Sequence, residues 1–333
     1  MDLANAVVAL LNFVVIPATA YGAQLALGAL GVTLVYGILR FSNFAHGDTM
    51  AFGTAMAILL TWALQGIGIA LTPLPTALLA LPIAIAVTAL LVLATDRLVY
   101  RFYRRRKVAP IILVMASVGV MFVMNGLTRL VIGVDEIRFD DGVRFIVSAG
   151  DFRRWTGLDE GLALRGTQVI TLGLAVGVVA WLFWFLNRTR SGKAMRAYSD
   201  NEDLALLSGI DPERVVRQTW IIAAALATLA GTLYGLDKTF KAFNYFQILL
   251  PIFAAAIVGG LGSPLGAIAG GFIVAFSEVA ITYPWRKVAA YAGWEPDGLM
   301  QLLSTEYKFA VSFVILIVVL LFRPTGLFRG KSV

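Results

Sequence analysis

The chain has 333 residues, of which 59% are hydrophobic and 14% charged, and its mean hydropathy is +0.83. These values exclude a water-soluble globular domain. The absence of cysteine and the single histidine exclude disulfides, thiolate metal sites, cysteine nucleophiles and a histidine metal cluster. We therefore expect no metal site and no bound cofactor.

Apolar stretches recur along the whole chain. A helix needs about 20 mostly apolar residues to cross the hydrocarbon core of a bilayer. In chain order the stretches run roughly from Ala6 to Thr19, Tyr21 to Leu39, Thr49 to Ile69, Thr76 to Thr95, Pro110 to Ile132, Gln168 to Leu186, Trp220 to Leu236, Phe246 to Leu261, Ala267 to Tyr283 and Tyr307 to Phe322. We expect an all-α, polytopic integral membrane protein, with one transmembrane domain over residues 1–333 and about nine or ten membrane segments.

The net charge of +7 raises the possibility of a nucleic-acid partner. The positions of the basic residues decide whether this charge indicates nucleic-acid binding or membrane topology. They form three clusters between or after apolar stretches: Arg97, Arg101, Arg104, Arg105, Arg106 and Lys107; Arg188, Arg190, Lys193, Arg196, Arg214 and Arg217; Arg323, Arg329 and Lys331. Such clusters are typical of cytoplasmic loops. We therefore predict that the chain lies in the lipid bilayer and binds no nucleic acid. We also predict a cytoplasmic loop at residues 188–217 and an external loop at residues 133–166.

A short polar segment from Arg40 to Asp48 joins two apolar stretches. It is too short and too apolar for an ordinary exposed loop, so we expect it at membrane depth. Irregular backbone there is tolerated when it is buried in protein or lines a cavity. Asn43, His46 and Asp48 therefore either satisfy buried backbone groups or face a solute path.

A second interruption follows Pro251 and is rich in glycine, with Gly259, Gly260 and Gly262 before a Ser-Pro pair. Glycine and proline together interrupt helices strongly. The segment is either a discontinuous helix whose backbone groups touch solute or a tight turn between two helices.

The loop at residues 188–217 contains its own helix signals. Ser199 and Glu202 have the spacing of a capping box, Gly209 is placed as a helix stop, and Asp211-Pro212 begins the next helix. The short helix carries Leu204, Ala205, Leu206 and Leu207. Such a helix either docks in a groove of a soluble partner or packs on its own domain.

No feature of the chain supplies energy or covalent chemistry. The segment from Gly326 to Ser332 is one residue short of a phosphate-binding loop and follows a membrane helix rather than a strand. Acids within the apolar stretches are few, Glu278 being the deepest, so an ion-coupled carrier is poorly supported. Clustered catalytic groups are not visible, and we predict no enzyme.

Four motifs resemble one known family: GILRFSNFAHGDTMAFG from Gly37, SGKAMRAYSDNEDLALLSGID from Ser191, AAAIVGGLGSPLGAIAGG from Ala254 and LLFRPTGLF from Leu320. Together they resemble the branched-chain amino acid permeases of ATP-binding-cassette importers, nearest the LivH type. The resemblance covers nearly the whole chain.

The resemblance implies a permease in the bacterial inner membrane that works with several partners: a second, LivM-like permease subunit, two cytoplasmic ATP-binding subunits and a periplasmic solute-binding protein. It also implies that the loop beginning at Ser191 is the coupling loop to the ATPases. The expected coupling residues are Ser199, Asp200, Glu202, Leu204, Ala205, Leu207 and Gly209. The expected pathway residues are Asn43, His46, Asp48, Gly259, Gly260 and Gly262.

The external loop is long and charged for that family, Lys238 and Lys241 add positive charge on the expected outer side, and the stretch from Trp285 to Glu306 is extended relative to the family pattern. Relatives of the family resemble importers of urea or short amides as well. We therefore expect a branched-chain or other small amino acid as the solute, with urea or a short amide as the alternative. A self-sufficient ion-coupled carrier is the alternative of another class.

Overall fold

The computed structural model describes residues 2–139, 141–142, 144–291, 294 and 301–328. Within these residues, eight helices are long and apolar enough to cross a membrane, and a ninth apolar helix, Lys308–Phe322, is shorter. This confirms a mostly helical, multi-pass membrane architecture. The predicted stretch from Trp285 to Glu306 and the segment from Gly326 to Ser332 lie partly outside the described residues.

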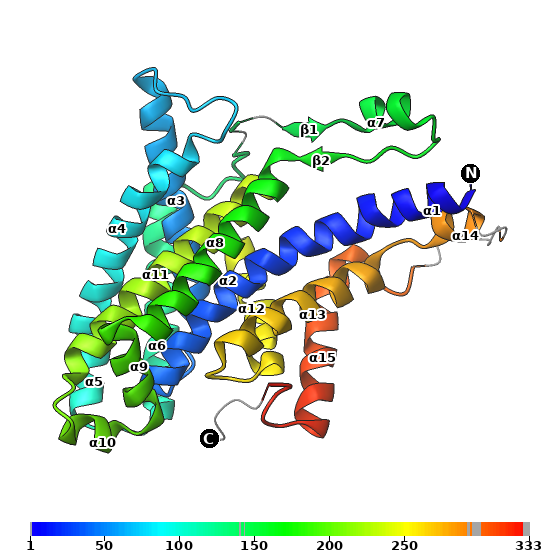
Figure 1. Cartoon of the computed structure of the whole chain (residues 1–333). Helices are drawn as coiled ribbons and strands as arrows, with labels where there is room; N and C mark the ends of the chain where they lie inside the picture. The colour runs from blue at the N-terminus through cyan, green and yellow to red at the C-terminus, as the bar shows by residue number, and fades with distance from the viewer. Residues whose placement is uncertain (1, 140, 143, 292–293, 295–300, 329–333) are drawn as a thin grey trace.

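Long helices follow one another with short links (Figure 1). The elements are α1 Asp2–Leu10, η1 Leu11–Val15, α2 Ile16–Leu39, α3 His46–Gly66, α4 Ala77–Thr95, η2 Asp96–Tyr100, α5 Arg101–Arg105, α6 Pro110–Ile132, β1 Phe145–Val147, α7 Ala149–Thr156, β2 Leu164–Arg165, α8 Gly166–Arg188, α9 Arg190–Asp200, α10 Glu202–Leu207, α11 Pro212–Asp237, α12 Ala242–Gly259, α13 Pro264–Thr282, α14 Arg286–Tyr291, η3 Thr305–Tyr307 and α15 Lys308–Phe322.

The first two predicted segments form one continuous helix of 38 residues, Asp2–Leu39. The prediction of a separate short segment from Ala6 to Thr19 was therefore wrong. A π-helical turn at Leu11–Val15 lies just before Pro17. Proline at the start of an α-helical register loses no hydrogen bond that the helix needs, so the chain continues through this position.

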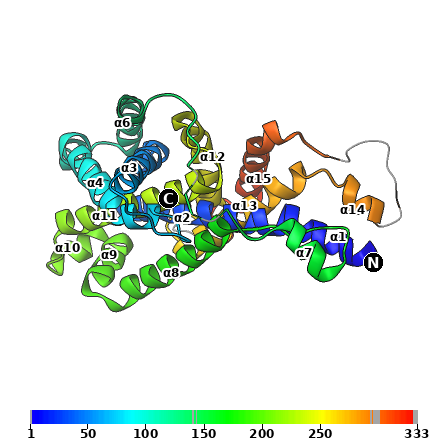
Figure 2. The same cartoon turned by 90° about the horizontal axis from the view of Figure 1, so that it is seen from above.

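Two helices form the centre of the bundle. In α11, 89% of the most apolar window is buried, against 22% in α8, so α11 is an inner helix and α8 a peripheral one. From Ala18 to the end of α2 almost every residue is buried, and α2 packs against α8, α11, α12 and α13. Seen from above, α3, α4 and α6 lie on one side of this pair, while α13, α15 and α14 lie on the other (Figure 2).

Glycines allow the closest of these helix approaches. A Cβ built on Gly231 of α11 would lie 2.8 Å from the Met50 carbonyl oxygen of α3, and one on Gly270 of α13 would lie 2.0 Å from the Ala255 carbonyl oxygen of α12. Small residues at these positions therefore let the helix backbones approach closely. At Gly173 and Gly177 of α8, by contrast, a Cβ would meet nothing within 4 Å among the described residues.

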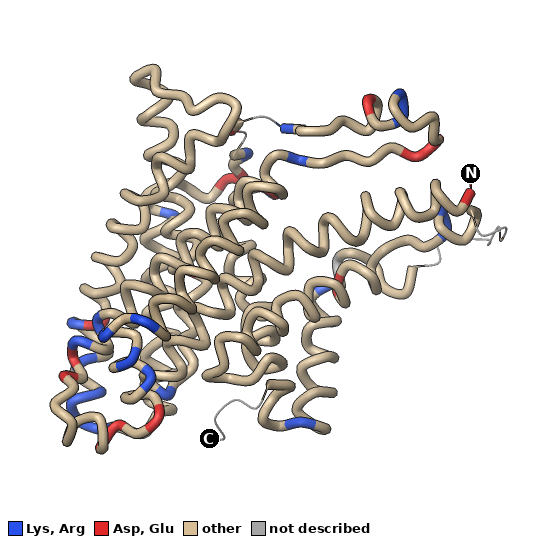
Figure 3. Tube along the Cα trace, in the orientation of Figure 1, with Lys and Arg blue, Asp and Glu red and all other residues tan. Residues whose placement is uncertain are grey.

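Charge separates the two ends of the molecule. Elements α5, α9 and α10 lie at one end, where α15 also ends, whereas β1, α7 and β2 lie at the opposite end (Figure 1). Most basic residues gather at the first end, and the segment at the other end carries both signs of charge (Figure 3). The two complete basic clusters are thus on one side of the bundle, as the loop assignment requires; the third lies partly outside the described residues.

Candidate functional site

The end with the basic clusters is built around a helix–turn–helix unit, α9 and α10. Asn201, between the two helices, caps α10, since its side chain accepts a hydrogen bond from the Leu204 backbone N–H at 3.0 Å. The predicted capping box of Ser199 and Glu202 was wrong, because α9 extends through Asp200 and places Ser199 inside it. Glu202 instead accepts a hydrogen bond of 2.6 Å from the Tyr198 hydroxyl.

Ser199 fastens this unit to the end of α2. Its hydroxyl donates to the Gly37 carbonyl at 2.9 Å, and its own carbonyl accepts from Arg40 Nη2 at 2.6 Å. Gly37 also lies against Gly262, whose Cα would be 3.9 Å from a Cβ at Gly37. Ser199, Asp200, Gly37 and Gly262 share the wall of a cavity of about 190 Å³. The helix α9 is therefore bonded directly to the end of α2 and shares a cavity with the glycine-rich turn.

The short helix α10 presents leucines outward. Leu204 is 61% and Leu207 85% exposed, whereas Ala205 is buried against the bundle. Gly209 follows with φ +78°, as its predicted role as a helix stop requires. Asp211 then caps α11 through the Glu213 N–H at 3.0 Å, with Pro212 in the first turn. The exposed leucines of α10 therefore lie at the tip of the bend that connects α10 to α11.

Ion pairs join the other basic cluster to the base of α11. Arg104 contacts the Asp96 carboxylate at 2.8 Å, and the same carboxylate accepts from the Trp220 indole N–H at 2.8 Å. Arg101 contacts Glu213 at 3.2 Å. Three elements, η2, α5 and α11, are thereby held together beside α9 and α10.

The polar segment between α2 and α3 turns back into the bundle. A Cβ built at Gly31 would lie 2.6 Å from His46 Cε1, and Gly31 stands eight residues before Leu39, which is about 12 Å along a helix. His46 therefore begins α3 well inside the bundle. Segment 40–45 is therefore a break within the helix bundle; its depth in the membrane stays a prediction.

The three polar residues at this break are buried. Asn43 Oδ1 accepts from the Ala45 N–H and from the Tyr100 hydroxyl, both at 3.2 Å. Asp48 Oδ1 accepts from Asn125 Nδ2 at 2.6 Å. Among the described residues, His46 Nε2 and Asp48 Oδ2 have no hydrogen-bond partner.

The glycine-rich break is a turn between two helices. The helix α12 ends at Gly259, Ser263 caps α13 through the Gly266 N–H at 3.2 Å, and Gly260 and Gly262 have φ of +111° and +83°. The carbonyls of Val258 and Gly259 accept hydrogen bonds from the backbone N–H groups of residues 327 and 328, at 2.9 and 3.1 Å. The chain's own terminal segment therefore occupies these carbonyl groups.

The two breaks lie beside the same helix but not in one cavity. Phe44 packs against Phe253 of α12 at a ring-centroid distance of 5.1 Å, which places the first break against the middle of α12. The turn at Gly260 lies beyond the end of that helix. The structure therefore groups Gly262 with Ser199 and Asp200, and groups Asn43, His46 and Asp48 separately.

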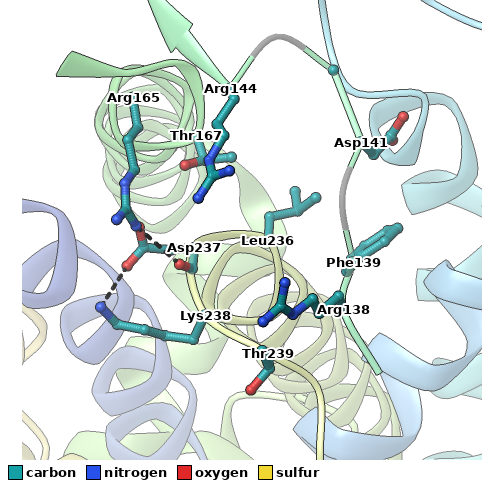
Figure 4. A pocket seen from close by; sticks show the side chains of 11 residues that line it. Arg138, Phe139, Asp141, Arg144, Arg165, Thr167, Leu236, Asp237, Lys238 and Thr239 are labelled. Atoms are coloured by element: carbon teal, nitrogen blue, oxygen red, sulfur yellow. Dashed lines mark hydrogen bonds and ion pairs between the residues drawn. The ribbon is translucent and has the colours of Figure 1, made fainter. Parts of the chain in front are cut away.

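A cationic cavity opens at the other end of the molecule. Its volume is about 460 Å³, and Arg138, Arg144, Arg165 and Lys238 line it together with Asp237 (Figure 4). The Asp237 carboxylate is 3.3 Å from Lys238 Nζ and 3.7 Å from Arg165 Nη1. More positive than negative groups face this cavity, so it suits an anionic group.

A further cavity of about 400 Å³ lies between α2, α13 and α15. Glu278 of α13 and Lys308 of α15 both line it. Sequence reasoning noted Glu278 as the deepest acid but did not find this site, because its other walls come from residues near position 20 and beyond position 300. The signal that could have found it is an acid within one span and a lysine at the start of another.

The buried spans, the polar breaks and the tethered exposed helix define a polytopic membrane permease. The chain matches the family described as branched-chain amino acid transport system / permease component over residues 15–320. It belongs to that family.

Named relatives agree with this assignment. The chain is 30% identical to the high-affinity branched-chain amino acid transport system permease protein LivH of Salmonella typhimurium, over 94% of this chain and 93% of that protein. It is 29% identical to BraD of Pseudomonas aeruginosa over 94% of each chain. A shorter similarity, 26% identity over 37% of this chain and 31% of the relative, links it to LivM of Escherichia coli. These relatives are transport permeases.

Proposed function

We propose that the chain is one permease subunit of an ATP-binding-cassette importer in a bacterial inner membrane. Its solute is a branched-chain or other small amino acid, delivered by a periplasmic binding protein. The second permease is a LivM-like subunit, and two cytoplasmic ATP-binding subunits supply the energy. The observation that carries this proposal is the exposed leucine pair of α10 on a unit fastened to α2, in a member of a transport permease family.

Residues 188–217 form the coupling loop in this proposal. Leu204 and Leu207 enter a groove on an ATPase, because burying exposed leucines favours association. When the ATPases close, α9 and α10 move as a rigid body and displace α2 and the Gly262 turn. Residues 133–166 lie outside and meet the binding protein.

The break around His46 belongs to the solute pathway. Buried polar atoms without partners are costly, and His46 Nε2 and Asp48 Oδ2 are two such atoms on one helix. Alternation between outward-open and inward-open states offers them partners in the other state, either solute, water or displaced backbone. Gly259, Gly260 and Gly262 contribute the mobile turn at the inner end of this path.

The test is to purify the complex with its binding protein and to screen that protein against leucine, isoleucine, valine, urea and acetamide by thermal shift. A ligand present at about a hundredfold its Kd adds about 2.7 kcal/mol to the free energy of unfolding, so the true solute raises Tm clearly. Stabilisation by urea or acetamide alone would replace the amino acid with an amide solute. Uptake that survives ATP depletion and collapses with an ionophore would contradict the ATP-driven mechanism.

A further inference from the structure

The cavity between α2, α13 and α15 has opposite charges on its walls. Glu278, Lys308 and Lys238 all line it, together with the rings of Phe13, Tyr21 and Tyr283. Phe13 stands in the π-helical turn Leu11–Val15, a feature frequent at functional sites. In Figure 2 the helices α13 and α15 lie apart from α3, α4 and α6, so this cavity is separate from the break at His46.

The Glu278 carboxylate is only half satisfied. Its side chain is 1% exposed, and Oε1 accepts a hydrogen bond from the Ser312 hydroxyl of α15. The Tyr21 hydroxyl lies near enough to Glu278 to interact with it, although the geometry between them falls short of a hydrogen bond, and no other group in the described part of the chain donates to Glu278 Oε2. A buried carboxylate in a membrane span is costly unless it is paired. A role in tying α13 to α15 accounts for Oε1 and leaves Oε2, beside the Tyr21 hydroxyl, able to accept from a cationic donor.

The two lysines bring positive charge to the same cavity. Lys308 lies near enough to attract Glu278, but within the described part of the chain it forms no hydrogen bond with Oε2. Lys308 Nζ lies 5.6 Å from the centroid of the Tyr21 ring and 4.8 Å from that of Phe309. Lys238 Nζ contacts Asp237 at 3.3 Å. An acid and two ammonium groups therefore line one cavity.

We propose that this cavity is a binding station for a zwitterionic amino acid. The solute's ammonium group donates to Glu278 Oε2, its carboxylate meets Lys308, and its apolar side chain packs on Phe13 and Tyr283. This assignment rests on the proposed function and adds to it the place and the chemistry of solute recognition. An uncharged amide hydrogen-bonds to these groups but brings no opposite charge to either, so the site favours amino acids over urea.

The position of Lys238 connects this station to the outer end of the molecule. Lys238 lines both this cavity and the cationic cavity of Figure 4. The arginines of that outer cavity attract the carboxylate of an incoming solute. A solute that leaves the outer cavity then meets Glu278 next, which supplies the missing partner for its ammonium group.

The absence of cysteine in the chain allows a direct test on the permease pair with its ATPases, without binding protein. Val279 lines the cavity, so alkylation of a Val279→Cys variant reports occupancy, and a Trp155→Cys variant on the exposed face of α7 serves as the control. We expect leucine to slow alkylation at position 279 several-fold and to leave position 155 unchanged. Absence of protection in a complex that imports leucine would overturn the station.

Two charge-deleted analogues then test each wall. We expect 4-methylpentanoate, which lacks the ammonium group, and isopentylamine, which lacks the carboxylate, each to protect more weakly than leucine. Glu278→Gln should raise the half-protecting concentration of isopentylamine about tenfold or more, and Lys308→Gln that of 4-methylpentanoate. Each variant should leave protection by the other analogue nearly unchanged.

Loss of protection by both analogues in both variants would show a general packing defect and overturn the charge assignment. Glu160→Gln, at an acid outside the cavity that pairs with Lys287, is the matched control and should protect normally. A wild-type complex that imports no amino acid would contradict the proposed function, whereas protection at position 279 by leucine, alanine or glutamine in that complex would still support the station.

Discussion

At the end proposed to be cytoplasmic, apolar side chains are exposed and polar groups are bonded, whereas between α2, α13 and α15 the reverse holds. Leu204 and Leu207 are exposed, while Ser199 forms hydrogen bonds through both its hydroxyl and its carbonyl. Glu278 is buried and keeps one oxygen without a partner. In our proposals an apolar groove on a partner protein covers the first region, and a charged small molecule binds in the second.

The largest effect is expected from removing the apolar face of α10. A Leu204→Asp, Leu207→Asp double variant loses two side chains worth about 1.5 to 3 kcal/mol each when buried. We expect ATPase binding to weaken by two orders of magnitude or more, with uptake lost. Pull-down of the ATPases and uptake at equal expression measure this. A Leu204→Met, Leu207→Met variant should retain both, and full activity of the aspartate variant would show that this face is not the docking surface.

A smaller effect is expected from straining the bend behind that face. A Cβ at Gly209 would meet nothing within 4 Å, so Gly209→Val acts through the backbone alone. Its φ of +78° costs a β-branched residue about 1 to 2 kcal/mol. We expect reduced stimulation of ATP hydrolysis by the binding protein and loss of uptake, in a complex that still assembles. Gly209→Asn tolerates this conformation and should stay active; normal uptake in Gly209→Val would contradict a transmitting role for the bend.

The break at His46 offers a third test, because it lies outside both regions. His46→Ala should reduce uptake several-fold at unchanged membrane expression. Gly31→Ala should produce the same defect, since its Cβ would lie 2.6 Å from His46 Cε1 and displace the imidazole. Gly126→Ala on α6 meets nothing within 4 Å and is the matched control. Unchanged uptake in both His46→Ala and Gly31→Ala would assign this segment to packing alone.

Sequence reasoning predicted the features that depend on local chemistry. The spans follow from runs of apolar residues, and the bend at Gly209 and the start of α11 at Asp211-Pro212 follow from helix-end preferences. The sequence prediction misplaced the cap of α10, because Ser199 and Asn201 are both good capping residues. In the structure the Ser199 hydroxyl bonds to α2 instead, which leaves Asn201 as the cap. A π-helical turn that lets a helix continue past Pro17 has no comparable signal in residue order.

Long-range proximity accounts for what was missed altogether. Glu278, Ser312 and Tyr21 come from three helices far apart in sequence, and nothing in the spacing of these residues indicates that they meet. A buried acid alone is a weak sign, since it is as often a structural partner as a binding group. Only the cavity beside Glu278 and its free oxygen separate the two roles.

The smallest expected effect concerns the outer end, where a charged group is buried but fully paired. Glu160 contacts Lys287 at 2.7 Å and accepts from the Tyr291 hydroxyl at 2.8 Å, which holds α14 against the external segment. Burial alone would raise the pKa of Glu160, but hydrogen bonds from Lys287 and Tyr291 outweigh it and leave that pKa below its usual range.

A carboxyl group whose pKa is lower in the folded state than in the unfolded state stabilises the fold above the unfolded pKa and loses this contribution as the pH falls through the folded value. We therefore expect the attachment of α14 to be constant from neutral pH down to about 4.5, the ordinary glutamate pKa, and to weaken below it. Because Lys287 is half exposed, the change should stay below about 1 kcal/mol. Hydrogen exchange of α14 amides across this range measures it. In Glu160→Gln the pH dependence should vanish, and the Glu278 station should bind as before, since its charges belong to a separate cavity; a pH response that persists in Glu160→Gln would place its origin elsewhere.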